Sequence, residues 1–143
     1  MNFKNQAEKL EKFLEEEFKK KTPLAVLPDK SLVYNRFKIK QNKARGYYLC
    51  HINNDVIDTF YLKATAAIAA KNYYNSRFDL YNHIKNLDTE YWTNFIDSAI
   101  FEERYKKSKD FAKKQIYLAR YSLTKQRAEN YRNQIATIFK NSF

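Results

Sequence analysis

Apolar residues near the start of the chain recur every three or four positions, with lysine and glutamate between them. This is the spacing of one face of an amphipathic helix, which we expect over residues 3–21. The helix should end before Pro23, because the residue that precedes a proline is disfavoured in helical geometry. Residues 22–31, with two prolines and an aspartate, favour an irregular connection. The apolar positions are Phe3, Ala7, Leu10, Phe13, Leu14 and Phe18.

The pattern then changes to an alternation typical of strands. Within residues 33–40, Phe37 and Ile39 alternate with basic residues, which predicts one buried face and one basic face. The runs 47–52 and 56–62 are also rich in residues that favour strands. Short connections separate the three runs, so we expect an antiparallel meander of three strands.

The remaining sequence is helical in character. An alanine-rich segment beginning at Lys63 predicts a helix that continues to about Leu87. We expect a break there, with Asp88 or Thr89 as the N-cap of a new helix. Residues 101–143 contain no Pro or Gly and predict one or two long helices. Their apolar stripe is Tyr105, Ala112, Ile116, Ala119, Leu123, Tyr131, Ile135 and Ile138.

These elements predict a mainly helical α+β fold: an N-terminal helix, a three-stranded antiparallel meander, and then about three helices including a long C-terminal one. The 143 residues, 44% of them hydrophobic, are enough for a single domain with one core. Within that domain, residues 1–87 would form a helix-sheet-helix part and residues 88–143 a helical part.

Residue counts exclude several kinds of chemistry. With a single glycine, the chain cannot form a glycine-rich loop that cradles phosphates. One cysteine and two histidines cannot supply a disulfide or a four-ligand zinc site. Cys50 and His51 are adjacent on a predicted strand and should point to opposite faces, so they cannot act as nucleophile and base. We therefore expect no enzyme activity, no catalytic residues, no cofactor and no metal.

One alternative is a metal-dependent nuclease. Asp55, Asp58 and Lys63 lie around the third predicted strand, loosely as in the carboxylate sites of such enzymes. Their pattern needs an acidic residue two positions before the lysine, where this chain has Tyr61. Turn aspartates are the preferred interpretation.

The net charge of +11 is typical of proteins that bind nucleic acid or another anionic partner. Part of it reflects composition, since abundant Lys, Asn, Tyr, Phe and Ile are what AT-rich codons produce. That composition indicates an AT-rich bacterium or one of its viruses. The acidic start of the chain, the absence of long apolar runs and the single cysteine favour a cytoplasmic protein, or a virion component, that does not bind membranes.

The predicted order helix, meander, helix over residues 3–86 resembles the double-stranded-RNA-binding domain. That family contacts phosphates through lysines at the start of its second helix. Setting residues 63–67 on this pattern keeps Lys63 but places Ala64 and Ala67 at the other two lysine positions. The family's Gly-Pro-x-His loop is absent. The third strand and its helix are also similar to the three-stranded DNA-binding domains of integrase arms and plant ethylene-response factors. These similarities concern topology alone.

Two groups of basic residues predict a nucleic-acid-binding surface that contacts phosphates. One follows a strand and its loop, with Tyr34 and Tyr48 as neighbours that could stack on bases. The other lies in the C-terminal helices. The candidates are Arg36, Lys38, Lys40, Lys43, Arg45, Lys63, Lys106 and Lys113. The alternative is a structural subunit of a larger particle or a homo-oligomer, which would bury Tyr117, Tyr121, Tyr131, Ile135, Ile138 and Phe139 against partner chains.

Overall fold

The computed structural model describes residues 25–27, 31–41 and 46–143. The helix predicted over residues 3–21 lies outside the described residues, as do Lys43 and Arg45. The described part is α+β and mainly helical, as expected from the sequence, with a small antiparallel sheet followed by three helices.

The sheet is an antiparallel meander in which each strand pairs with the next one in sequence. The three predicted strands are confirmed as the last three strands of this sheet, and two further strands precede them. Gly46, just before the fourth strand, has a φ of +111°, and a Cβ there would lie 2.5 Å from the Phe60 carbonyl oxygen. Only glycine fits this approach between neighbouring strands. The strands are β1 (Ala25–Val26), β2 (Leu32–Tyr34), β3 (Phe37–Gln41), β4 (Tyr47–His51) and β5 (Val56–Phe60).

The single strand predicted over residues 33–40 is in fact a tight hairpin of β2 and β3. Tyr34 pairs directly with Phe37, so the chain reverses over two residues. Asn35 adopts a φ of 52°, a left-handed conformation that asparagine tolerates better than most residues. The alternation of Phe37 and Ile39 is correct for β3, but it does not extend back across the turn.

The helices are α2 (Lys63–Tyr74), α3 (Phe78–Lys107) and α4 (Phe111–Ser142). The break predicted near Leu87 is wrong, because α3 runs through it without interruption. Asp88 does cap a helix, but the helix is α2: the Asp88 carboxylate accepts hydrogen bonds from the backbone N–H groups of Tyr61 and Leu62. The residues preceding α2 have no side-chain cap of their own, so a carboxylate from α3 takes that role.

The first real break follows Tyr74. The Ser76 N–H donates to the Tyr73 carbonyl and the Arg77 N–H donates to the Asn72 carbonyl, with Ser76 at a φ of 56°. This is the hydrogen-bond pattern of a Schellman motif, which normally places glycine in the left-handed position. Serine in that position gave no sequence signal for the break.

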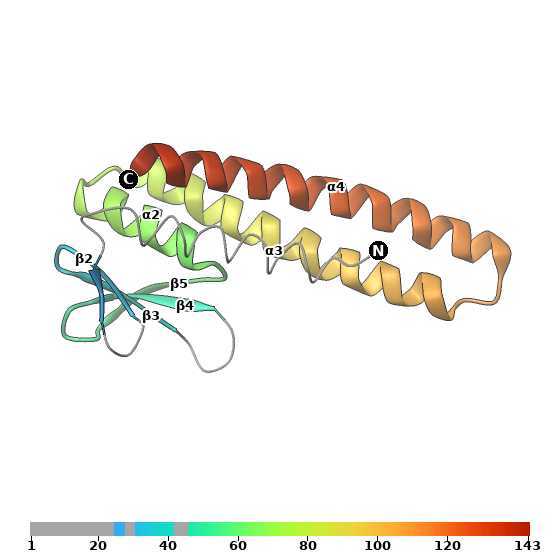
Figure 1. Cartoon of the computed structure of the whole chain (residues 1–143), viewed down its shortest axis with the longest axis horizontal. Helices are drawn as coiled ribbons and strands as arrows, with labels where there is room; N and C mark the ends of the chain where they lie inside the picture. The colour runs from blue at the N-terminus through green and yellow to red at the C-terminus, as the bar shows by residue number, and fades with distance from the viewer. Residues whose placement is uncertain (1–24, 28–30, 42–45) are drawn as a thin grey trace.

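The second break separates the two long helices. Asp110 is the N-cap of α4, and its carboxylate accepts hydrogen bonds from the N–H groups of Ala112 and Lys113. The resulting α3–α4 hairpin is antiparallel and extends well beyond the sheet (Figure 1). None of residues 99–120 is buried, so this end of the hairpin has no core of its own. None of the helices in the described ranges is both long and apolar enough to cross a membrane.

The core lies between α2 and one face of the sheet, closed by the first half of α3 and the last half of α4 (Figure 1). Seven consecutive residues of α2, from Ala64 to Ala70, are buried. Their small side chains let the helix approach the strands closely. From the sheet, Leu32, Ile39 and Leu49 fill the facing layer.

The apolar stripe predicted along the C-terminal helix is only partly buried. Ile135 belongs to the core, but Ile116 and Leu123 are exposed. In this part of the helix the side toward α3 buries Tyr121, Thr124 and Ala128 instead. The first half of α4 therefore turns its apolar stripe to the outside.

Candidate nucleic-acid interface

Lys38, Lys40 and Tyr48 lie together on the face of the sheet opposite α2. Phe37 and Ile39 are buried toward the helices, and because side chains alternate along a strand, Lys38 and Lys40 must project from the other face. Tyr48 is the direct cross-strand neighbour of Lys40 and shares that face. No described helix covers this outer face of the sheet (Figure 1).

The outer face continues onto the fifth strand. Thr59, an exposed residue of β5, pairs with Tyr48, so lysine, tyrosine and threonine form one row across three strands. The described residues that project from this face include no carboxylate. Sequence reasoning missed Thr59, because a register shift between Leu49 and Cys50 changes which residue of β5 pairs with Tyr48.

Cys50 lies on the floor of the same face. It pairs with Lys38 across the strands, and its side chain is buried. Burial raises the pKa of the Cys50 thiol, while the ammonium groups of Lys40 and Lys38 oppose part of that rise. Both ammonium groups thus act electrostatically on the thiol, which is consistent with all three side chains lying on the same face. His51 points the other way, with its ring centroid 5.7 Å from that of Phe37.

Arg36 belongs to a different surface. Its guanidinium lies over the Tyr74 ring, 5.9 Å from the centroid, at the end of α2. Tyr74 also packs edge-on against Tyr34 and Phe37. The turn between β2 and β3 therefore directs Arg36 toward an aromatic cluster on the helix side, away from the outer face.

The remaining described candidates are dispersed. Lys63 is the first residue of α2 and is half-buried. Lys106 forms an ion pair with Glu102 one turn earlier, with 2.9 Å between nitrogen and oxygen. Lys113 is exposed in the first turn of α4. Figure 1 shows that the turn between α3 and α4 lies far from the sheet. Of the six described candidates, Lys38 and Lys40 share the outer face, and the other four lie elsewhere.

Asp58, considered above as a metal ligand, is instead held in an ionic hydrogen-bond cluster. The Tyr81 hydroxyl donates to one carboxylate oxygen at 2.5 Å, and Lys85 donates to the other at 3.0 Å. Burial opposes ionisation of Asp58, but the bonds from Tyr81, Lys85 and the Thr59 N–H outweigh it and lower its pKa. Burial, followed by the same contact with Asp58, raises the pKa of Tyr81. These groups connect α3 to β5.

Asp55 is held elsewhere, in the turn that precedes β5. It exchanges two hydrogen bonds with Asn53, at 3.0 and 3.1 Å. Among the residues that the structure describes, no three His, Cys, Asp or Glu side chains are grouped as metal ligands would be. The two aspartates therefore serve separate local structures.

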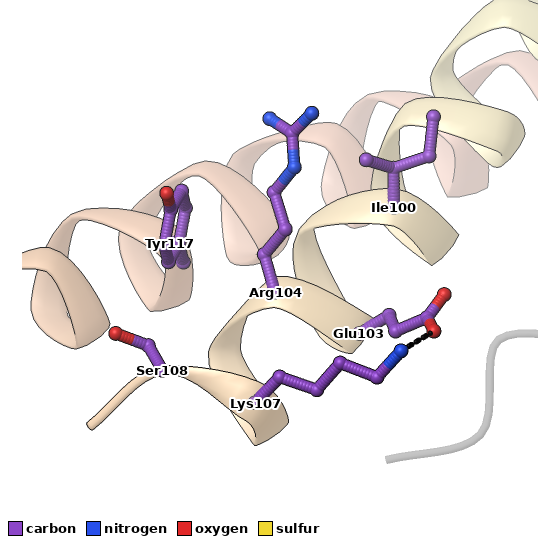
Figure 2. A pocket seen from close by; sticks show the side chains of 6 residues that line it. All are labelled: Ile100, Glu103, Arg104, Lys107, Ser108 and Tyr117. Atoms are coloured by element: carbon purple, nitrogen blue, oxygen red, sulfur yellow. Dashed lines mark hydrogen bonds and ion pairs between the residues drawn. The ribbon is translucent and has the colours of Figure 1, made fainter.

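A shallow pocket of about 450 Å³ lies where α3 ends (Figure 2). Glu103 and Lys107 on its rim form an ion pair at 2.6 Å, and this contact lowers the pKa of Glu103. Ile100, Arg104, Ser108 and Tyr117 complete the lining. The one carboxylate among these lining residues is thus already paired with a lysine.

Comparison with known proteins adds no functional assignment: no family model matches the chain, and no curated protein or solved structure is significantly similar to it.

Proposed function

We propose that the protein binds single-stranded nucleic acid on the outer face of its sheet. The observation that supports this most directly is the pairing of Lys40 with Tyr48, with Lys38 two residues away on the same face. The lysines would contact phosphates, and the tyrosine ring would stack on a base.

A single strand fits this surface better than a duplex. Unpaired bases can be splayed across a sheet and stacked on an aromatic side chain, whereas the bases of a duplex are already stacked on each other. Most of the affinity would come from lysine ammonium groups, so binding should be salt-dependent and tolerant of sequence. The net charge of +11 would speed the encounter with a polyanion.

The test compares Lys38→Ala/Lys40→Ala with Lys106→Ala/Lys113→Ala. Both double variants lose two positive charges, but only the first loses them from the outer face. Affinity for a fluorescent oligonucleotide should be measured over a salt series. Loss of two phosphate contacts should lower the slope of log K against log salt by about 1.4, taking about 0.7 per contact on a single strand. The Lys106→Ala/Lys113→Ala variant should nearly retain the wild-type slope.

A third variant, Tyr48→Thr, keeps a residue that favours strands and removes the ring. Since stacking on an aromatic side chain contributes about 1–3 kcal/mol per base, single-strand affinity should fall about tenfold, with little change for a duplex. No binding by the wild type at low salt, or equal losses in both lysine variants, would refute the assignment to this face.

A further inference from the structure

The first half of α4 carries an apolar stripe that no described part of the chain covers. Ile116 and Leu123 are 51% and 47% exposed, and the small residues Ala112 and Ala119 are exposed between and beside them. These four positions are separated by three or four residues, so they lie along one side of the helix. In Figure 1, α4 runs along the side of α3 away from the sheet.

Basic residues flank this stripe at intervals of seven. Lys113, Arg120 and Arg127 are all exposed and, at that interval, lie on one side of α4 over about 21 Å. The whole of α4 contains seven Lys or Arg residues and one acidic residue, the half-buried Glu129. The surface thus combines a narrow apolar seam with a positive edge that borders α3, where the Arg120 guanidinium lies 5.8 Å from the centroid of the Phe101 ring.

The arrangement has the geometry of one side of a coiled coil. Ile116 and Leu123 are spaced as core residues of successive heptads, and alanines beside them allow close approach of another helix. The basic residues occupy positions that select partners by charge. A nucleic acid would gain nothing from isoleucine and leucine at the centre of its contact surface.

A second copy of the chain does not suit this seam. Two helices related by a two-fold axis present the same surface to each other. In a parallel pair each cation would face itself, and in an antiparallel pair centred on Arg120 that residue would face its own copy while Lys113 faced Arg127. Like charges at such positions are destabilising.

We propose that the outer face of α4, defined by Ala112, Lys113, Ile116, Ala119, Arg120, Leu123 and Arg127, binds an acidic amphipathic helix of a partner protein. The apolar residues of that helix pack on Ile116 and Leu123, and its Glu or Asp residues pair with the flanking cations. This interaction is independent of the proposed nucleic-acid interface on the sheet.

The probe is a synthetic peptide of about three heptads, with leucine at the core positions and glutamate at the flanking ones. A second peptide carries lysine in place of glutamate. Binding to the full chain is measured by calorimetry and by the gain of peptide helicity in circular dichroism. The glutamate peptide should bind, and the lysine peptide should bind at least tenfold more weakly.

Two variants assign the interaction to the stripe and to its edge. Ile116→Ser/Leu123→Ser removes the exposed apolar groups and should weaken binding of the glutamate peptide about tenfold or more. Lys113→Glu/Arg127→Glu reverses two exposed charges and should reverse the preference, so that the lysine peptide binds better. Lys38→Ala/Lys40→Ala is the control and should bind the glutamate peptide as the wild type does.

Three outcomes would overturn the proposal. The first is equal binding of both peptides by the wild type. The second is that Ile116→Ser/Leu123→Ser weakens binding to phosphatidylserine vesicles or to an oligonucleotide while peptide binding is unchanged. The third is a self-associated species in light scattering that this variant abolishes, since the occupant would then be a second copy.

Discussion

Thr65 of α2 donates its hydroxyl to the Asp88 carboxylate of α3, at 2.6 Å between the oxygens. Asp88 is fully buried and also accepts the N–H groups of Tyr61 and Leu62, at 2.9 and 3.1 Å. Burial raises the pKa of Asp88, while these three hydrogen bonds favour its anion. One carboxylate of α3 thus hydrogen-bonds to the residues that connect β5 to α2 and to the first turn of α2. These bonds fix the position of the α3–α4 hairpin relative to the sheet.

Replacing that carboxylate should be among the most damaging single changes in the chain. Asp88→Ala leaves the N–H groups of Tyr61 and Leu62 without their acceptor, while the Thr65 hydroxyl can still donate to the Leu62 carbonyl, and we expect a loss of about 3 kcal/mol in the free energy of unfolding. Urea denaturation followed by circular dichroism measures this loss. Glu90→Ala, which removes an exposed carboxylate from the same helix, should cost less than about 0.5 kcal/mol. Similar losses in the two variants would contradict this role of Asp88.

The Tyr81 hydroxyl should control the titration of Asp58. Because the folded-state pKa of Asp58 is lowered, its contribution to stability is present above the unfolded value of about 4 and is lost as pH falls through the folded value. Tyr81→Phe removes one hydrogen bond to the anion, so the Asp58 pKa should rise. The free energy of unfolding should then change less between about pH 7 and pH 3 than it does in the wild type.

The pKa can be followed directly by the carboxyl carbon resonance of Asp58 in NMR. Tyr73→Phe is the matched control, since it removes a tyrosine hydroxyl from α2 that donates no described hydrogen bond to Asp58. An unchanged Asp58 pKa in Tyr81→Phe, or an equal shift in both variants, would contradict the link between the two residues.

Ser76→Gly should stabilise the protein. Ser76 has a φ of 56°, in the left-handed region, which costs an ordinary residue about 1–2 kcal/mol and glycine much less. We expect the melting temperature to rise by about 3 °C. Asn75→Gly is the control, because Asn75 has a φ of −86° and gains nothing from glycine. A rise in both variants, or a fall in Ser76→Gly, would argue against a strained helix end.

The sequence predicts the sheet better than the ends of the helices. Alternation identified β3, and the Asn-Asn-Asp turn located the boundary between β4 and β5, since both signals depend on near neighbours. The break after Tyr74 was missed because serine takes the place of glycine at position 76. Asp88 was assigned to the wrong helix because its capping partners lie 23 to 27 residues earlier in the chain.

The candidate surfaces depend on which face of each element is covered. Periodicity identifies an apolar stripe but not the direction in which it points, and Ile116 and Leu123 of the predicted stripe are exposed. Conversely, Tyr121, Ile135 and Phe139 were considered for contact with partner chains and are buried within this one. Strand alternation correctly predicted that Lys38 and Lys40 share one face. Arg36 lies in the hairpin turn instead, and its side chain contacts Tyr74 on the helix side.

The central claim is that the outer face of the sheet binds single-stranded nucleic acid. The most direct test is an NMR titration of the isotope-labelled protein with a short mixed-sequence oligonucleotide, following backbone amide shifts. The account predicts that the largest changes occur at Lys38, Lys40, Tyr48 and Thr59, with little change along α4. No shift changes at low salt, or changes concentrated on α4 around Lys113 and Arg127, would contradict it.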